Sequence, residues 1–151
     1  MGQIVGIDLG TTNSVVGVIE GGRPIVIANS EGSRTTPSIV GFTKDKEIVI
    51  GDQARRQLVL NPKNTFFNLK RFIGSDWDEL DENSISVPYN VKANNTGSVR
   101  VLSPNTEREY APEELVSSLI RKLINDAETY LGDTVESVSY THLTLPTSNS
   151  V

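Results

Sequence analysis

The residues best suited to chemistry lie in a polar turn near the N-terminus, directly after an apolar run that contains Asp8. Gly10 allows the backbone to turn sharply, and Thr11, Thr12 and Asn13 offer N–H groups and polar side chains within one concavity. Such donors suit a polyphosphate, and Asp8 could hold Mg²⁺ through its water shell. The pattern is compatible with phosphate binding, but a plain hairpin could also use the same residue types.

The elements around this turn are expected to be strands. Residues 4–9 form an apolar run, residues 15–19 a second β-branched run, and residues 24–28 a third run after the turn signal Gly21-Gly22. No Gly-Lys-Ser/Thr follows the polar turn, so it is not a Walker-type loop. No helix follows it either, so the anion site would not be a helix N-terminus. The expected device is a β-hairpin turn that clamps phosphate.

The middle of the chain alternates short extended runs with turns. Residues 37–42 and 48–50 are expected to be extended, and Asp52 is expected to cap a helix over residues 53–60 that Pro62 ends. The periodicity of residues 64–74 decides nothing. The other expected elements are a short helix or turn at 76–83 and strands at 87–91, 99–102 and 107–110.

The clearest helix is predicted over residues 112–131. Pro112 suits the first helical position, the two glutamates after it suit the positive N-terminal end, and Gly132 suits the C-cap. Apolar residues recur at three- and four-residue steps, which places them on one face. These residues are Leu115, Val116, Leu119, Ile120, Leu123, Ile124, Ala127 and Leu131.

Bulk composition argues against several classes of protein. A length of 151 residues fits one domain or a fragment of a larger one. A net charge of −5 without a basic run argues against nucleic-acid binding. The absence of cysteine and the single histidine, His142, argue against disulfides, zinc fingers and His-based triads. No apolar run approaches the ~20 residues needed to span a membrane, and no signal peptide is recognisable, so a cytoplasmic or organelle-interior protein is expected.

Residues 4–14 resemble the first phosphate motif of the actin-like ATPase superfamily, in the form found in DnaK-type chaperones of the seventy-kilodalton heat-shock family. Further matching motifs follow in order over nearly all of residues 1–137, and an ordered set of this kind is very specific. The motifs are Glu31-Gly32-Ser33-Arg34-Thr35-Thr36-Pro37-Ser38, Gly51-Asp52-Gln53-Ala54, Asn61-Pro62, Asn64-Thr65, Lys70-Arg71-Phe72-Ile73-Gly74 and Tyr110-Ala111-Pro112-Glu113-Glu114.

The resemblance implies an α/β fold: the incomplete first lobe of an actin-like, ribonuclease H-like ATPase, with a mixed sheet and flanking helices. It also implies ATP and Mg²⁺ as cofactors. Asp8 would lie near the metal, and the turn Gly10-Thr11-Thr12-Asn13 would bind the phosphates. Lys70 would be the catalytic residue, which approaches the γ-phosphate and places the attacking water or stabilises charge, since phosphoryl transfer depends mainly on positioning and electrostatics.

For the whole protein, the resemblance implies an ATP-dependent chaperone that assists protein folding in the stress response. Its partners would be unfolded client proteins, a J-domain co-chaperone and a nucleotide-exchange factor. Residues 2–7 and 64–67 are similar to cyanobacterial or plastid members, which implies the cytoplasm or the plastid stroma. The family's second phosphate motif lies beyond this chain, so the chain alone is expected to bind nucleotide weakly and to hydrolyse it hardly at all.

Two other classes share the phosphate hairpin: small-molecule kinases and filament-forming actin-like proteins. The motifs at residues 34–38 and 70–74 favour the chaperone over both. After Ser137 the family pattern stops, and residues 138–151 are expected to be a foreign tail that arises from a frameshift, a truncated reading frame or a sequence-assembly artefact. The first tail residues could still extend a strand, and His142 is interpreted as incidental.

Overall fold

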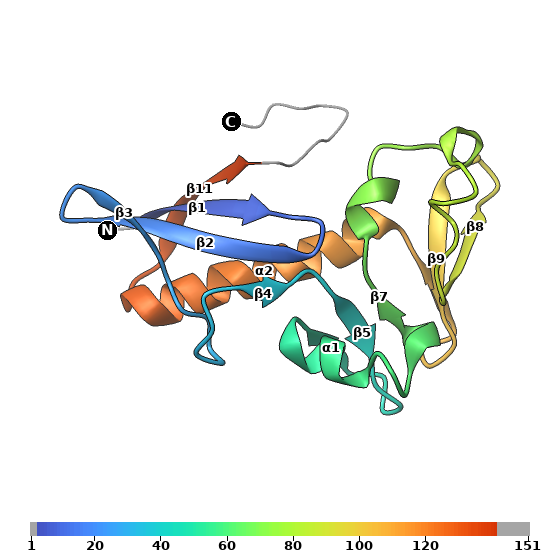
Figure 1. The fold of residues 1–151 in the computed structure, drawn as a ribbon, viewed down its shortest axis with the longest axis horizontal. Helices are drawn as coiled ribbons and strands as arrows, with labels where there is room; N and C mark the ends of the chain where they lie inside the picture. Colours follow the sequence, from blue (N-terminus) through green and yellow to red (C-terminus); the bar gives the residue numbers. More distant parts are fainter. Residues whose placement is uncertain (1–2, 142–151) are drawn as a thin grey trace.

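The N-terminal strands form a mixed sheet, and the predicted polar turn joins two of its strands (Figure 1). The computed structural model describes residues 3–141, in which β1 (Gln3–Leu9), β2 (Asn13–Glu20) and β3 (Arg23–Val26) form the expected antiparallel meander. β11 (Val135–Thr141) pairs in parallel with β1, and β4 (Thr36–Pro37) pairs with β2, which completes five strands. The predicted α/β class with a mixed sheet is confirmed.

The long helix α2 (Pro112–Leu131) packs on one face of this sheet and confirms the predicted helix at both ends. Pro112 is its first residue, and Gly132 ends it in the left-handed conformation at φ 67°. Its predicted apolar face shares one hydrophobic core with the inward residues of β1, of which Ile7 is 1% exposed, whereas Ile4 on the opposite face is 66% exposed. Alternation along the strands therefore fixes which face of the sheet α2 covers.

The other half of the molecule contains two small sheets that share an aromatic core. The rings of Phe42 and Tyr110 stack at 4.8 Å, and Phe66 packs edge-on against Phe42 and Tyr89. One sheet has the order β6-β5-β7 and the other the order β10-β9-β8. Their strands are β5 (Val40–Phe42), β6 (Ile48–Ile50), β7 (Thr65–Phe66), β8 (Asn90–Ala93), β9 (Val99–Ser103) and β10 (Arg108–Tyr110).

The predicted helix over residues 53–60 is wrong at both ends. α1 spans Asp52–Gln57, so Asp52 is its first residue and Gly51, at φ 73°, takes the cap position without a side-chain hydrogen bond. The helix stops because its continuation would bury nothing: Val59 and Leu60 are 86% and 89% exposed.

Two extended segments also differ from the prediction. The strand expected at 87–91 begins only at Asn90, because Pro88 has no N–H to donate to a ladder. The extended run at 37–42 is split between β4 and β5, which belong to different sheets. The undecided segment 64–74 contains β7, one complete short helix and the last residue of another, and a third short helix follows it. The short helices are η1 (Pro62–Asn64), η2 (Leu69–Phe72) and η3 (Trp77–Glu79), the last within the predicted short helix or turn.

The predicted tail boundary at residue 138 falls within β11. Residues 138–141 continue this strand alongside β1, which confirms that the first tail residues extend a strand. His142 and the rest of the tail lie outside the described residues. Within residues 3–141, no helix combines the length and apolarity that membrane crossing requires.

Candidate phosphate-binding site

The polar turn joins β1 to β2 and depends on the absence of a side chain at Gly10. A Cβ atom at this position would lie 2.3 Å from the backbone oxygen of Asn13, far inside any non-bonded contact. Thr11, Thr12 and Asn13 are exposed at the tip of the hairpin. The turn is therefore tight, and three consecutive polar residues face solvent there, as the sequence predicted.

The segment that follows β4 lies behind the turn and holds two of its carbonyl groups. The Ser38 hydroxyl donates to the Gly10 carbonyl at 2.9 Å, and the Ser38 N–H donates to the Thr12 carbonyl at 2.9 Å. The hydroxyls of Ser14 and Ser38 are also 2.9 Å apart, and both side chains are buried. The turn is thus anchored from one side while its tip stays open.

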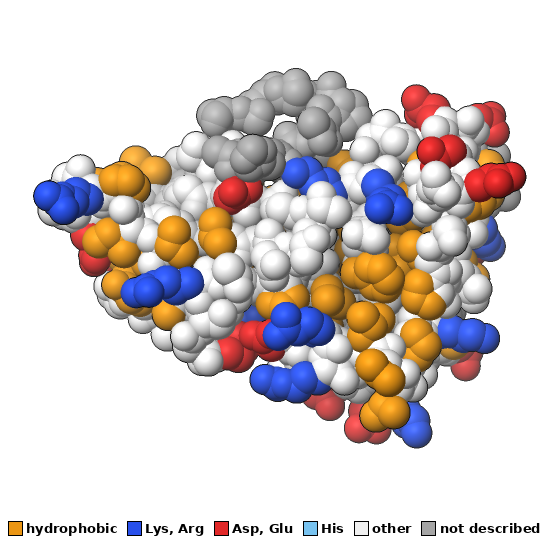
Figure 2. Space-filling model, in the orientation of Figure 1, with side chains coloured by type: hydrophobic (Ala, Val, Ile, Leu, Met, Phe, Trp, Pro, Cys, Tyr) orange, Lys and Arg blue, Asp and Glu red, His pale blue; other side chains and the backbone are white. Residues whose placement is uncertain are grey.

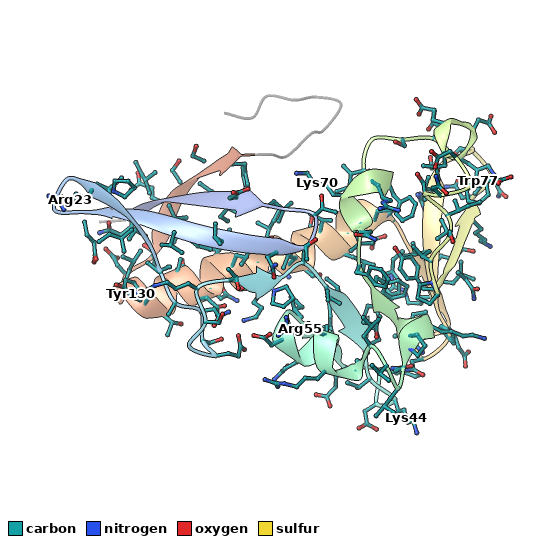
Figure 3. All side chains as sticks on the ribbon, in the orientation of Figure 1. Arg23, Lys44, Arg55, Lys70, Trp77 and Tyr130 are labelled. Carbon is teal, nitrogen blue, oxygen red and sulfur yellow. The ribbon has the colours of Figure 1, made fainter. Side chains whose placement is uncertain are left out.

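Lys70 reaches the same turn from η2, 61 residues further along the chain. Leu69 and Phe72 are buried and fix η2 in the core, while Lys70 is half-buried and projects toward the turn (Figure 3). Its Nζ donates to the Leu9 carbonyl at 3.0 Å. A small pocket here is lined by Leu9, Gly10, Thr11, Ser38, Leu69, Lys70, Val116 and Leu119.

Asp8 lies at the carboxyl end of β1, opposite Val15 in β2 and Thr141 in β11. It is half-buried, on the sheet face that α2 does not cover. Among residues 3–141 no group of three or more His, Cys, Asp or Glu residues could hold a metal. A single carboxylate still fits Mg²⁺, which takes one or two carboxylates and completes its shell with water and substrate phosphates.

The structure therefore brings the predicted phosphate residues and Lys70 together around one turn, with Asp8 in the adjoining strand. The sequence assigns no role to Ser14 or Ser38. The only signal for Ser38 is its place at the end of the motif over residues 31–38, because its hydrogen bonds to Gly10 and Thr12 are tertiary contacts.

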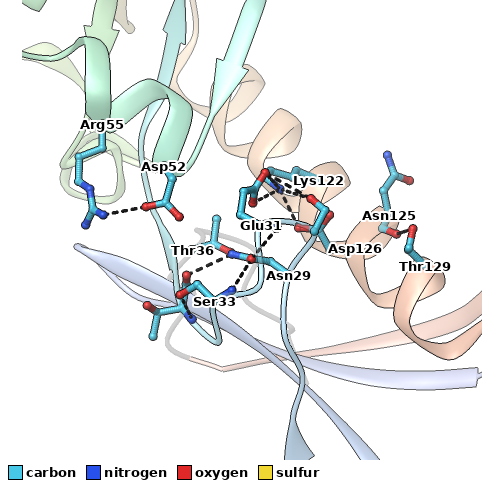
Figure 4. Close-up of polar contacts among 12 residues, drawn as sticks. Asn29, Glu31, Ser33, Thr36, Asp52, Arg55, Lys122, Asn125, Asp126 and Thr129 are labelled. Atoms are coloured by element: carbon cyan, nitrogen blue, oxygen red, sulfur yellow. Dashed lines mark hydrogen bonds and ion pairs between the residues drawn. The ribbon is translucent and has the colours of Figure 1, made fainter.

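The loop that leads into β4 is tied to α2 by Lys122 (Figure 4). The Lys122 Nζ lies 2.7 Å from the Asp126 carboxylate and 3.1 Å from that of Glu31. Burial acts to lower the pKa of Lys122, but its hydrogen bonds to Asp126 and Glu31 outweigh burial and raise the pKa above the ordinary value. Within the loop, Asn29 donates to the Thr36 hydroxyl at 3.0 Å and accepts from the Ser33 N–H at 2.9 Å.

Two hollows that are larger than the pocket at the turn lie away from it. One of about 390 Å³ lies between the small sheets and α2, and its lining includes Phe42, Lys46, Arg108 and Tyr110. On the face drawn in Figure 2, the described Lys and Arg side chains are scattered among acidic and hydrophobic ones. The turn is thus distinguished by its hydrogen bonds and by Lys70, not by cavity size or a basic surface.

Comparison with known proteins gives one consistent result. The family model for Hsp70 protein matches residues 4–147. The chain is 86% identical over 141 residues to chaperone protein dnaK1 of Prochlorococcus marinus subsp. pastoris, which covers 93% of this chain and 21% of that protein. It is 58% identical over 135 residues to chaperone protein dnaK3 of Thermosynechococcus vestitus, covering 89% of this chain and 20% of that protein.

The chain spans about a fifth of the length of these relatives. The family match runs to residue 147, past residue 138 where the motif comparison places a foreign tail, and the origin of that tail stays a prediction. Because the match covers nearly all of the sequence and agrees with the turn, Lys70 and the mixed sheet, the chain belongs to the Hsp70 family.

Proposed function

We propose that this chain forms the N-terminal wall of the ATP site in an ATP-dependent chaperone. The observation that carries the proposal is the convergence of Lys70 on the hairpin turn: its Nζ lies 3.0 Å from the carbonyl of Leu9, the residue before Gly10. A cation placed beside three exposed polar residues and their N–H groups suits the phosphates of a nucleotide.

In this proposal, Thr11, Thr12 and Asn13 bind the phosphates through N–H and side-chain groups, and Gly10 keeps their backbone within reach. Lys70 stabilises the negative charge that develops during transfer of the γ-phosphate to water, or places that water. Asp8 would hold Mg²⁺ through bound water, and the metal would offset phosphate charge.

The chaperone role rests on family membership and on the relatives' names. Each relative described above is named a chaperone protein. We propose that the whole protein couples ATP hydrolysis to the binding of unfolded client proteins, with a J-domain co-chaperone and a nucleotide-exchange factor. Its proposed location is the cytoplasm of a cyanobacterium or the plastid stroma. The Hsp70 match over residues 4–147 favours this role over a small-molecule kinase or a filament protein.

A full-length chimera tests the proposal. Residues 4–137 of this chain would replace the matching segment of the Prochlorococcus marinus relative, and single-turnover ATP hydrolysis would be measured. We expect hydrolysis by the chimera and a loss of about 10²–10³-fold in rate for Lys70→Ala, the range seen when one charge-stabilising group is removed.

Lys63→Ala is the matched control, because Lys63 is an exposed lysine in η1 with no place in the proposed site. Its rate should equal that of the parent chimera. A folded chimera that cannot hydrolyse ATP, or equal rates for Lys70→Ala and Lys63→Ala, would contradict the proposal.

A further inference from the structure

Ser38 holds the hairpin turn at two points that are two residues apart. Its hydroxyl donates to the Gly10 carbonyl and its N–H donates to the Thr12 carbonyl, each at 2.9 Å. Because a trans peptide directs each carbonyl opposite to the following N–H, these bonds turn the N–H groups of Thr11 and Asn13 away from Ser38. One buried residue therefore sets the direction of two donors in the turn.

The hydroxyl of Ser38 is itself held in one orientation. Its single proton is used on the Gly10 carbonyl, so the contact of 2.9 Å with Ser14 must be a hydrogen bond donated by the Ser14 hydroxyl. The result is a directed chain from Ser14 to Ser38 to Gly10, in which each bond polarises the next. Ser38 is only 7% exposed and Ser14 is fully buried, so water competes little with this chain.

The backbone around Ser38 explains why this residue carries the contact. Pro37 lies opposite Asn13 in the ladder between β4 and β2 and has no N–H to donate. The N–H that reaches the turn is therefore that of Ser38. Ser38, the first residue after β4, thus supplies both a backbone donor and a side-chain donor to the back of the turn.

We infer that Ser38 is a positioning residue of the nucleotide site, which orients the turn for phosphate without touching the nucleotide. This inference rests on the function proposed above. It predicts that loss of the Ser38 hydroxyl releases the Gly10 carbonyl and lets the peptide between Gly10 and Thr11 rotate. The turn then presents its donors in several orientations, and phosphate binding must restore the productive one at a cost in affinity.

The test uses ¹⁵N-labelled 151-residue chain, with amide NMR spectra recorded without ligand and during titration with Mg-ATP. Without ligand, Ser38→Ala should shift the amide signals of Thr11 and Asn13 and speed their hydrogen exchange. With Mg-ATP, it should weaken binding about tenfold, equivalent to about 1.4 kcal/mol. Ser38→Thr, or Ser38→Cys if the threonine variant does not fold, should restore part of the affinity.

Ser103→Ala is the matched control. Ser103 is a buried serine whose hydroxyl donates to the Asn64 side chain at 2.7 Å, away from the turn. Its loss should lower the melting temperature without shifting the Thr11 and Asn13 amides or weakening Mg-ATP binding.

The outcomes test the positioning role of Ser38 separately from the proposed nucleotide-binding function. If Ser38→Ala behaves like Ser103→Ala in both arms, the positioning role is overturned. If the wild-type chain is too weak a binder to respond to Mg-ATP, the affinities of wild type and Ser38→Ala are compared in the full-length chimera. A chimera that does not bind Mg-ATP overturns the proposed function, and the nucleotide part of this inference fails with it. The ligand-free spectra then still decide whether Ser38 holds the turn.

Discussion

At the scale of single residues, the site is defined by a glycine and a lysine that lie far apart in sequence. Gly10 permits a turn in which the Asn13 oxygen occupies the space of a Cβ atom. Lys70 then supplies the positive charge beside this turn. Neither residue can be replaced by a chemically similar one. Gly10 is required because it has no side chain, and Lys70 is required because it carries a positive charge at the end of a long side chain.

Gly10→Ala should destabilise the chain and displace the turn. The added Cβ would meet a backbone atom, which cannot swing aside as a side chain can, and overpacking of this kind costs about 1–3 kcal/mol. Gly6→Ala is the control in the same hairpin, since its Cβ would meet nothing closer than 4.0 Å. Urea unfolding of both variants would measure the difference, and equal stabilities would show that the turn has room for a side chain.

The sequence located the turn because its evidence is local: a glycine and three polar residues between two apolar strands. Lys70 could be assigned only through its motif, since a lone lysine has no periodicity that marks it. Ser38 could not be assigned a role at all, because its contacts depend on how β4 pairs with β2. Local chemistry was predictable from the residues, and contacts across the sheet were not.

At the scale of elements, α2 packs against more than one part of the molecule. It covers the main sheet, and through Lys122 it also holds the loop that leads into β4. The first and last residues of α2 were predictable because its 20-residue amphipathic pattern begins and ends with clear capping signals. α1 was misjudged because a helix of 6 residues takes its ends from tertiary packing rather than from its own sequence.

The contribution of Lys122 to the stability of the fold should decrease at high pH. Its pKa is raised in the folded chain, so its stabilisation is fully present below the ordinary lysine value of 10.5 and is lost as the pH rises through the higher folded value. Lys122→Met should therefore lower stability at pH 7 by about 1–2 kcal/mol. The difference in stability between the variant and the wild type should begin to narrow above pH 10.5.

Thermal unfolding of both proteins between pH 7 and 11 would measure this gap. Lys92→Met is the control, because Lys92 forms an exposed ion pair with Glu109 and such pairs contribute little. A gap for Lys122→Met that is constant up to pH 11, or one no larger than that of Lys92→Met, would show that Lys122 does not tie the loop to α2.

At the scale of the whole molecule, we propose that the chain supplies one wall of a larger site. It spans about a fifth of the relatives' length, and the described residues contain the proposed phosphate turn and the proposed catalytic lysine, Lys70, but no metal-binding cluster. The predicted fold class, the first lobe of an actin-like ATPase, agrees with the Hsp70 match. A site with one wall can contact phosphate but cannot enclose it, and positioning depends on both sides.

Calorimetric titration with Mg-ATP tests this central claim most directly when the 151-residue chain is compared with the full-length chimera. The account predicts that the chimera binds at least about a hundredfold more tightly than the chain alone. It also predicts that Asp8→Ala, Lys70→Ala in the chimera abolishes that gain. Equal affinities for chain and chimera, or a double variant that binds like its parent, would contradict the assignment of this turn as one wall of the ATP site.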